Sequence, residues 1–118
     1  MKIIYKDDKT YELCNDIKKS SKRLGVEVSY KLFTLMQVLE NSKNLYEIQL
    51  LPYYRLHKLK GDRKEQYSLT IHKGSKYRLI ILPYDENDKM IEINDNEKQM
   101  LIKTVMIEIL EVSEHYEK

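Results

Sequence analysis

Apolar side chains recur at steps of three and four residues through the first third of the chain, a spacing that is typical of amphipathic helices. One side of a first predicted helix is apolar and consists of Leu13, Cys14, Ile17, Ser21 and Leu24. A second helix follows, and its apolar side consists of Val28, Leu32, Leu35, Met36 and Leu39. Gly25 lies between them at the position of a left-handed helix cap, so the two stretches predict a helical hairpin.

From residue 50 onward the pattern becomes that of strands. Tyr67, Leu69 and Ile71 alternate with polar residues and would share one face of a strand. Residues 77–82 are apolar apart from Arg78, which predicts a central strand. Short strands are also expected at residues 2–5 and 104–112, with a long loop at 85–99. The order predicts an α+β fold, in which a mostly antiparallel sheet carries two helices on one face.

The chain has 118 residues, 42% of them hydrophobic, which is the size and composition of one domain that spans residues 1–118. Its single cysteine, Cys14, excludes an intrachain disulfide and a thiolate metal site and is expected to be a small buried side chain. No apolar stretch approaches the roughly 20 residues that span a bilayer, and no secretory signal opens the sequence, so we expect a cytoplasmic protein.

The net charge of +2 conceals an uneven distribution of charged side chains. Residues 55–78 contain eight basic and two acidic side chains, whereas residues 85–118 contain four basic and ten acidic ones. A basic segment with tyrosines among its strands, namely Tyr53, Tyr54, Tyr67 and Tyr77, favours binding of a phosphate backbone with bases stacked on the rings. A solvated face or a surface for a protein partner are the alternatives.

Four short stretches resemble the plasmid-maintenance killer proteins, the HigB-like branch of the RelE toxin superfamily. They are Leu51-Pro52, Arg55-Leu56-His57-Lys58-Leu59-Lys60-Gly61-Asp62-Arg63-Lys64, Gln66-Tyr67-Ser68 and Tyr77-Arg78-Leu79-Ile80. The resemblance implies a RelE-like fold and a type II toxin of the bacterial cytoplasm, a metal-independent endoribonuclease that cuts mRNA on the ribosome. It further implies a cognate antitoxin with a helix-turn-helix, so that the toxin contacts DNA only indirectly, through the antitoxin. No cofactor and no membrane partner are expected.

The same resemblance assigns roles to individual residues. His57 matches the family's histidine and would act as acid or base, since imidazole exchanges protons near neutral pH; an ordinary strand histidine is the alternative. Arg78 would stabilise the charge on the reacting phosphate, unless it pairs with a C-terminal acid. The cations expected to bind RNA are Arg55, Lys58, Lys60, Arg63, Lys64 and Lys76.

The C-terminus departs from the family pattern. Where the family has Asp-Tyr-His, this chain has Glu114-His115-Tyr116, so the aromatic residue and the histidine are exchanged. Either Tyr116 replaces the catalytic histidine, or a bend brings His115 to the site, or the last residues fray. Two functions therefore stay open: an active mRNA endoribonuclease, or a weak or inactive relative that pairs with its antitoxin in control of their operon.

Overall fold

One five-stranded sheet organises the molecule. The computed structural model describes residues 1–63, 65–90 and 96–114. The strands are β1 (Lys2–Tyr5), β2 (His57–Lys58), β3 (Tyr67–Thr70), β4 (Arg78–Tyr84) and β5 (Met106–Ser113), in the spatial order β1-β5-β4-β3-β2. Only the β1–β5 pair is parallel, which confirms the predicted mostly antiparallel sheet with β4 at its centre.

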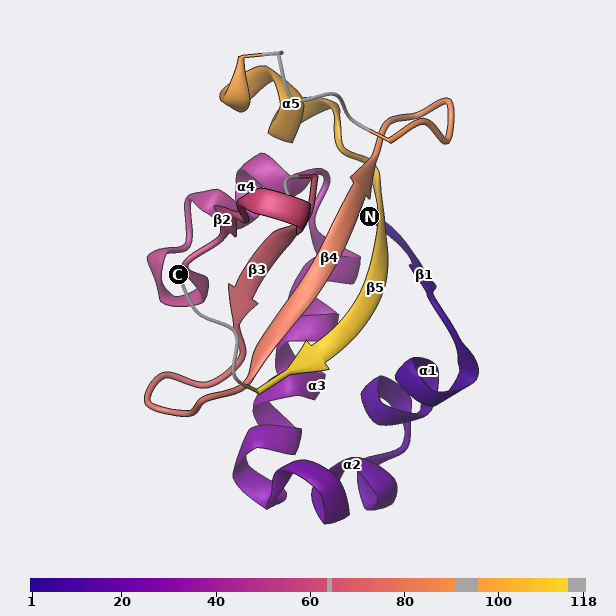
Figure 1. The fold of residues 1–118 in the computed structure, drawn as a ribbon, viewed down its shortest axis with the longest axis vertical. Helices are drawn as coiled ribbons and strands as arrows, with labels where there is room; N and C mark the ends of the chain where they lie inside the picture. The colour runs from indigo at the N-terminus through magenta and orange to yellow at the C-terminus, as the bar shows by residue number, and fades with distance from the viewer. Residues whose placement is uncertain (64, 91–95, 115–118) are drawn as a thin grey trace.

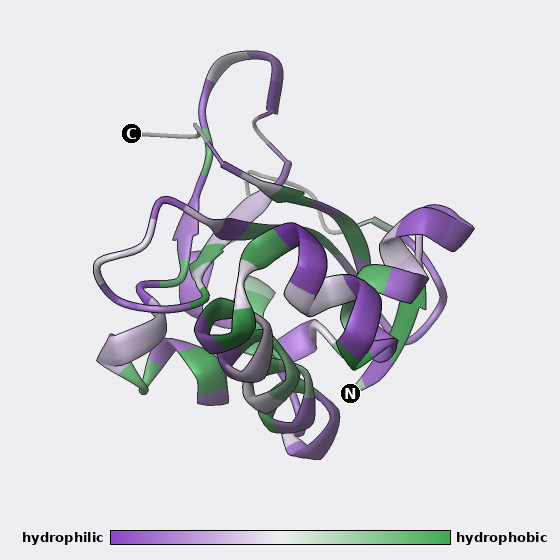
Figure 2. Cartoon of the chain, turned by 90° about the horizontal axis from the view of Figure 1, so that it is seen from below, coloured by the Kyte–Doolittle hydropathy of each residue, from purple (hydrophilic) through white to green (hydrophobic). Residues whose placement is uncertain are grey.

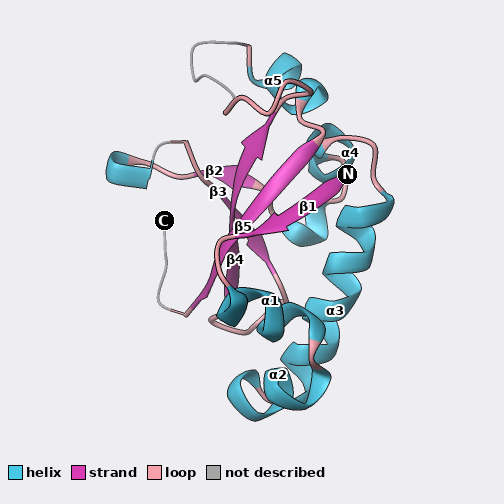
Figure 3. Cartoon of the chain, turned by 90° about the vertical axis from the view of Figure 1, so that its right-hand side faces the viewer, coloured by secondary structure: helices cyan, strands magenta, loops and turns pink. Residues whose placement is uncertain are grey.

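Helices cover one face of this sheet, with the longest of them running along it (Figures 1 and 3). The helices are α1 (Asp8–Asn15), α2 (Ile17–Leu24), α3 (Val26–Asn41), α4 (Leu45–Gln49) and α5 (Glu97–Lys103), with 3₁₀ turns η1 (Pro52–Tyr54) and η2 (Gly61–Arg63). In the described part of the chain no helix has the length and apolar character needed to cross a membrane.

The first predicted helix is divided in two by Asp16. This residue has an extended backbone, and its amide still donates to the Glu12 carbonyl at the end of α1. Its carboxylate accepts a 3.2 Å hydrogen bond from the Lys19 amide at the start of α2. Aspartate is a strong N-cap because it satisfies such an otherwise unpaired amide, so a new helix begins here although the apolar spacing continues.

The main core lies between α3 and the sheet. Leu32, Leu35 and Leu39 of α3 are fully buried in one cluster with side chains from the central strands, namely Tyr67, Leu69, Leu79, Ile81, Ile107 and Ile109. In Figure 2 green hydrophobic and purple hydrophilic stretches alternate along the helices, while the outer loops are largely purple. Cys14 joins this cluster at 2% exposure, as predicted, and burial raises the pKa of its thiol to about 12.

The segment predicted as a long loop contains a helix. Tyr84 forms a bridge with Met90 through a tight turn, and α5 then begins behind Asn96, whose side chain accepts from the Gln99 amide. Met100 and Leu101 are buried, and α5 lies against α4. Only two of the seven residues of α5 are buried, so the hydrophobic pattern in this acidic region was too short to predict a helix.

Candidate nucleic-acid interface

The face of the sheet opposite α3, which we call the open face, carries two of the predicted catalytic residues, His57 and Arg78. Leu69, Leu79 and Ile81 belong to the core, so the residues that alternate with them point the other way. The strand register aligns one row of open-face residues across four strands: His57, Ser68, Ile80 and Glu111. A second row, one pleat further along, consists of Thr70, Arg78 and Ser113.

His57 and Arg78 therefore lie on the same face, in adjacent rows and two strands apart. With strands about 4.8 Å apart and a rise of about 3.4 Å per residue, their Cα atoms are separated by about 12 Å. One ribose-phosphate unit between two long side chains fits a separation of this size. The structure thus brings together two residues that are 21 positions apart in the sequence.

The ring of His57 is oriented by the backbone. Its Nδ1 lies 2.8 Å from the carbonyl oxygen of Arg55, so the tautomer protonated at Nδ1 donates to that carbonyl. Arg55 has a φ of 45°, in the left-handed region that non-glycine residues rarely adopt. Among the described residues Nε2 has no hydrogen-bond partner, and in this tautomer it is the acceptor that remains for a substrate proton.

Arg78 is anchored through one end of its guanidinium group. Its Nη1 donates to the carbonyl oxygens of Ser75 and Tyr77, both at 2.9 Å, in the connection between β3 and β4. Within the described residues it forms no ion pair with a carboxylate. A guanidinium group has five N–H donors, so donors remain for a phosphate oxygen.

Two of the cations expected to bind RNA are paired with carboxylates. Arg63 of η2 lies 2.9 Å from Glu111 of β5, a contact that links the β2–β3 connection to β5 across the two intervening strands. Lys76 lies 3.2 Å from Glu114 and 5.8 Å from the centroid of the Tyr77 ring. The acidic third of the chain therefore reaches into the basic surface rather than lying apart from it.

The remaining predicted cations are divided between the faces. Arg55 and Lys60 are exposed. Lys58 is the register partner of Tyr67, which places it on the opposite side of β2 from His57. Lys64, and the two C-terminal candidates His115 and Tyr116, lie outside the described residues.

The expected stacking surface of four tyrosines does not form. Tyr67 is 1% exposed and belongs to the main core, where burial raises the pKa of its hydroxyl to about 12, so it cannot stack on a base. Tyr54 and Tyr77 are half-buried against that core. Only Tyr53 of this group is exposed, at 40%, and its ring packs edge-on against Tyr54.

Two open-face hydroxyls were not predicted as site residues. Ser68 and Thr70 are at most 5% exposed, and within the described structure their hydroxyl oxygens have no hydrogen-bond partner. Each is the register partner of a predicted catalytic residue, Ser68 of His57 and Thr70 of Arg78. Their position between Tyr67, Leu69 and Ile71 in the alternating pattern was the available signal.

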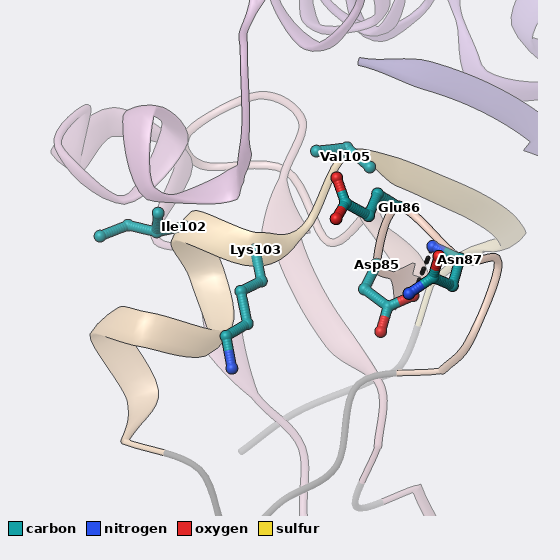
Figure 4. A pocket seen from close by; sticks show the side chains of 6 residues that line it. All are labelled: Asp85, Glu86, Asn87, Ile102, Lys103 and Val105. Atoms are coloured by element: carbon teal, nitrogen blue, oxygen red, sulfur yellow. Dashed lines mark hydrogen bonds between the residues drawn. The ribbon is translucent and has the colours of Figure 1, made fainter.

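Two cavities lie away from His57 and Arg78. One of about 400 Å³ is lined by Asp85, Glu86, Asn87, Ile102, Lys103 and Val105, where the Asn87 amide donates to Asp85 at 2.8 Å (Figure 4). Another of about 240 Å³ lies beside residues 110–112 of β5 and the start of α1. Neither of these two cavities is lined by His57 or Arg78, and the second includes Glu111 of the His57 row.

No group of three or more histidine, cysteine, aspartate or glutamate side chains within the described ranges is arranged to hold a metal ion. The described groups at the open face include an imidazole, guanidinium groups and hydroxyls. These groups can accept and donate a proton and stabilise negative charge on an oxygen.

Comparison with solved structures identifies a chain of the same fold. The sequence matches no family model and none of the curated proteins with which it was compared. Its structure is similar to that of a YoeB/ParE toxin from Agrobacterium tumefaciens, with a TM-score of 0.52 and 14% identity over 98% of this chain and 100% of the other. The α+β architecture is thus that of a toxin structure, and the predicted fold class is confirmed.

Proposed function

We propose that this protein is the toxin of a type II toxin–antitoxin system and acts as a metal-independent endoribonuclease. The observation that carries the proposal is the open face itself: on a fold shared with a toxin, the register gives His57 and Arg78 adjacent rows of one surface. The resemblance of residues 51–80 to the HigB-like branch supports the same activity. It also supports mRNA on the ribosome as the substrate, in the bacterial cytoplasm.

The proposed reaction is attack of an RNA 2′-oxygen on its neighbouring phosphate. His57 Nε2 removes the proton of the 2′-hydroxyl as the new O2′–P bond forms and the P–O5′ bond breaks. Arg78 stabilises the negative charge that develops on the non-bridging phosphate oxygens. The leaving 5′-oxygen takes a proton from a second group, for which His115 and Tyr116 are the candidates that the sequence provides.

Positioning of the backbone is assigned to the cations around these two residues. Arg55 and Lys60 are exposed and would bind phosphates on either side of the reacting one. The side chain of Arg55 would do so while its carbonyl orients the imidazole. A cognate antitoxin with a helix-turn-helix would silence the toxin and mediate any contact with DNA.

A binding module without catalysis is the second candidate. The observation that favours it is the pairing of Arg63 with Glu111 and of Lys76 with Glu114, which lowers the positive charge available to RNA. Such a protein would pair with its antitoxin in operon control and would not arrest growth. Antitoxin binding is common to both candidates, so cleavage of RNA distinguishes them.

The test is inducible expression in a bacterial host, with growth and primer-extension mapping of mRNA ends as the measurements. Wild type should arrest growth and produce new 5′ ends, and His57→Ala and Arg78→Ala should lower cleavage by about 100-fold. The matched controls are His72→Ala, whose imidazole contacts Glu27 of α3, and Arg23→Ala in α2, and both should retain toxicity.

Each outcome of this experiment has a defined meaning. A wild-type protein that neither slows growth nor cuts mRNA excludes the endoribonuclease and leaves the binding module. If wild type is toxic but His57→Ala is equally toxic, the assignment of the base is wrong although the family is right. If all four variants lose toxicity together, their unfolding transitions show whether the fold was lost.

A further inference from the structure

We propose that the cavity of about 240 Å³ beside β5 is the docking site for an extended acidic segment of a protein partner. We call it the edge cavity. The segment would pair with the edge of β5 and place a glutamate carboxylate among the cations that line the cavity. The inference rests on the proposed function in one respect, since the partner of a type II toxin is its antitoxin. The chemistry of the site follows from three features of the described residues.

An open strand edge is the first feature. β1 pairs with β5 only along residues 106–109, and the Lys6 amide donates to the Ile109 carbonyl where the chain leaves the sheet. β5 continues to Ser113 with β4 on its other side, whereas β1 leads away towards α1 (Figure 1). Apart from the pairing with β4, residues 110–113 form no backbone–backbone hydrogen bond within the described part of the chain. An extended peptide can pair with such an edge through its own main chain.

Three basic side chains without an acidic partner are the second feature. Lys6 and Lys9 line the edge cavity from the start of α1, and Arg23 lines it from the last turn of α2. All three are exposed, and none of them forms an ion pair with a described carboxylate. Like charges around one cavity repel each other. A bound carboxylate would therefore be attracted by all three and would offset their repulsion.

Two carboxylates also line the edge cavity, and both have other partners. Asp7 caps α1, because its Oδ1 accepts hydrogen bonds from the Thr10 amide at 2.8 Å and the Thr10 hydroxyl at 2.7 Å. Glu111 is turned to the open face by a β-bulge at Leu110, which has no register partner, and lies 2.9 Å from Arg63. A polyanion such as RNA would bring further negative charges towards these two carboxylates. The edge cavity therefore favours a single negative group over a run of phosphates.

The size and the apolar part of the lining are the third feature. A volume of about 240 Å³ is below the roughly 300–1,000 Å³ of typical small-molecule sites. Leu13 is buried, and Leu110 and Val112 are half-buried, so apolar groups lie beside the cations. A glutamate side chain has the matching composition, since it carries a carboxylate on an apolar stem.

The experiment titrates the isotope-labelled protein with a capped ten-residue peptide of alternating glutamate and threonine and follows the amide chemical shifts. Shifts should concentrate at residues 6–10 and 110–113, with a dissociation constant in the millimolar range. A peptide with glutamine in place of glutamate should bind at least about fivefold more weakly, because it brings no charge to the cations. A peptide with proline in place of threonine lacks every second main-chain donor and should lose binding to a similar extent.

Variants of the protein test the cations one at a time. Lys9→Gln and Arg23→Gln should each weaken peptide binding about threefold to fivefold, the factor that corresponds to one exposed charge pair. Lys18→Gln is the matched control, since Lys18 is an exposed lysine of α2 that does not line the edge cavity and forms no ion pair with a described carboxylate. It should leave peptide binding unchanged. Equal unfolding midpoints establish that the variants are folded.

A second titration separates a protein partner from RNA. Binding of single-stranded 2′-O-methyl RNA, which cannot be cut through its 2′-oxygen, should differ by less than about twofold between wild type, Lys9→Gln and Arg23→Gln. Retained toxicity of Arg23→Ala agrees with this expectation, because the edge cavity takes a protein segment and not the substrate. If these variants lose RNA binding as strongly as peptide binding, the edge cavity belongs to the RNA path and the inference is wrong.

Three further results would overturn the inference: no shifts at residues 6–10 and 110–113, equal binding of the glutamate and glutamine peptides, or equal weakening by Lys9→Gln and Lys18→Gln. The proposed function fails by a different observation. A wild-type protein that binds the acidic peptide but neither arrests growth nor cuts mRNA would keep the docking site and lose the endoribonuclease.

Discussion

The two faces of the sheet are built from the same strands and differ in almost every property. Along β3, Tyr67 and Leu69 belong to the main core, while Ser68 and Thr70 face the other way, with hydroxyls that have no hydrogen-bond partner among the described residues. Along β4, Leu79 and Ile81 pack toward α3, while Arg78 is directed to carbonyls at the strand entrance. Alternation thus separates residues that stabilise the fold from residues available for chemistry, although they are neighbours in sequence.

This comparison shows that the groups which do not stabilise the fold are gathered on one face of the sheet. The helix-covered face buries leucine and isoleucine side chains that are 0% exposed, and their removal from water stabilises the fold. The open face contains buried hydroxyls without partners and carboxylates beside the row of His57, none of which favours folding. Ser68, Thr70 and Ile80 are at most 5% exposed, so the centre of this face is buried as well, and the leucine and isoleucine core on the other face supplies the stability that allows it to carry such groups.

The largest expected effect is on the covered face. Ile81→Ala should lower the free energy of unfolding by about 2–5 kcal/mol, because the side chain is fully buried and leaves a cavity. Arg78→Ala, three residues earlier on the same strand, should change it by about 1 kcal/mol or less, since it removes only partly exposed hydrogen bonds. Urea titrations measure both, and equal losses would contradict the division between the faces.

The second largest effect is expected at alkaline pH, which should lower the free energy of unfolding through two groups of the covered face. Burial raises the pKa values of Cys14 and Tyr67 to about 12 from ordinary values of 9.0 and 10.0. The unfolded chain therefore releases these protons first, so stability is fully present below about pH 9 and is lost as the pH rises toward 12, on the order of a few kcal/mol. Unfolding midpoints between pH 7 and 12 measure the loss, and Cys14→Ala with Tyr67→Phe should flatten it.

Removing the hydroxyls of Ser68 and Thr70 should change the free energy of unfolding in the opposite direction. Ser68→Ala and Thr70→Val are expected to leave stability unchanged or raise it by up to about 1 kcal/mol, since each takes away a buried polar group without a partner. A loss above 1 kcal/mol in chemical denaturation would show that these hydroxyls support the fold. RNA binding by the same variants then tests whether they face the substrate.

The smallest effect is expected at Arg55. Its φ of 45° is strained for any residue with a Cβ, so Arg55→Gly should raise the free energy of unfolding by about 0.5–1 kcal/mol. Arg55→Ala is the control, because it removes the same charge and keeps the strain. If glycine and alanine give equal stability, the backbone turn that orients His57 is not strained.

How much of this was visible in the sequence depends on the range of each interaction. The face of β3 was predicted because Tyr67 and Leu69 alternate with polar residues, and the central position of β4 was predicted because residues 77–82 are almost all apolar. The break at Asp16 and the helix that begins after Asn96 were not predicted. Each of these two helices begins at a side-chain capping hydrogen bond, which the spacing of apolar residues does not reveal.

The candidate site shows the same limit. His57 and Arg78 were found from a sequence resemblance, but their shared face follows only from a register that extends over three strands. The contact between Arg63 and Glu111 joins residues 48 positions apart, and no local pattern encodes it. The sequence analysis placed Glu111 only in the acidic segment 85–118, and the bulge at Leu110, which turns its side chain onto the open face, has no local sequence signal.

The parallel pairing of β1 with β5 has a consequence for biosynthesis. Residues 2–5 have no partner in the sheet until residues 106–109, about 100 positions later, have been translated. β5 is also the partner of β4, so an unfinished nascent chain has β1 separated from the rest of the sheet. A translating ribosome would thus hold a growing polypeptide whose open face stays incomplete until residues 106–113 have been made and can pair with β4.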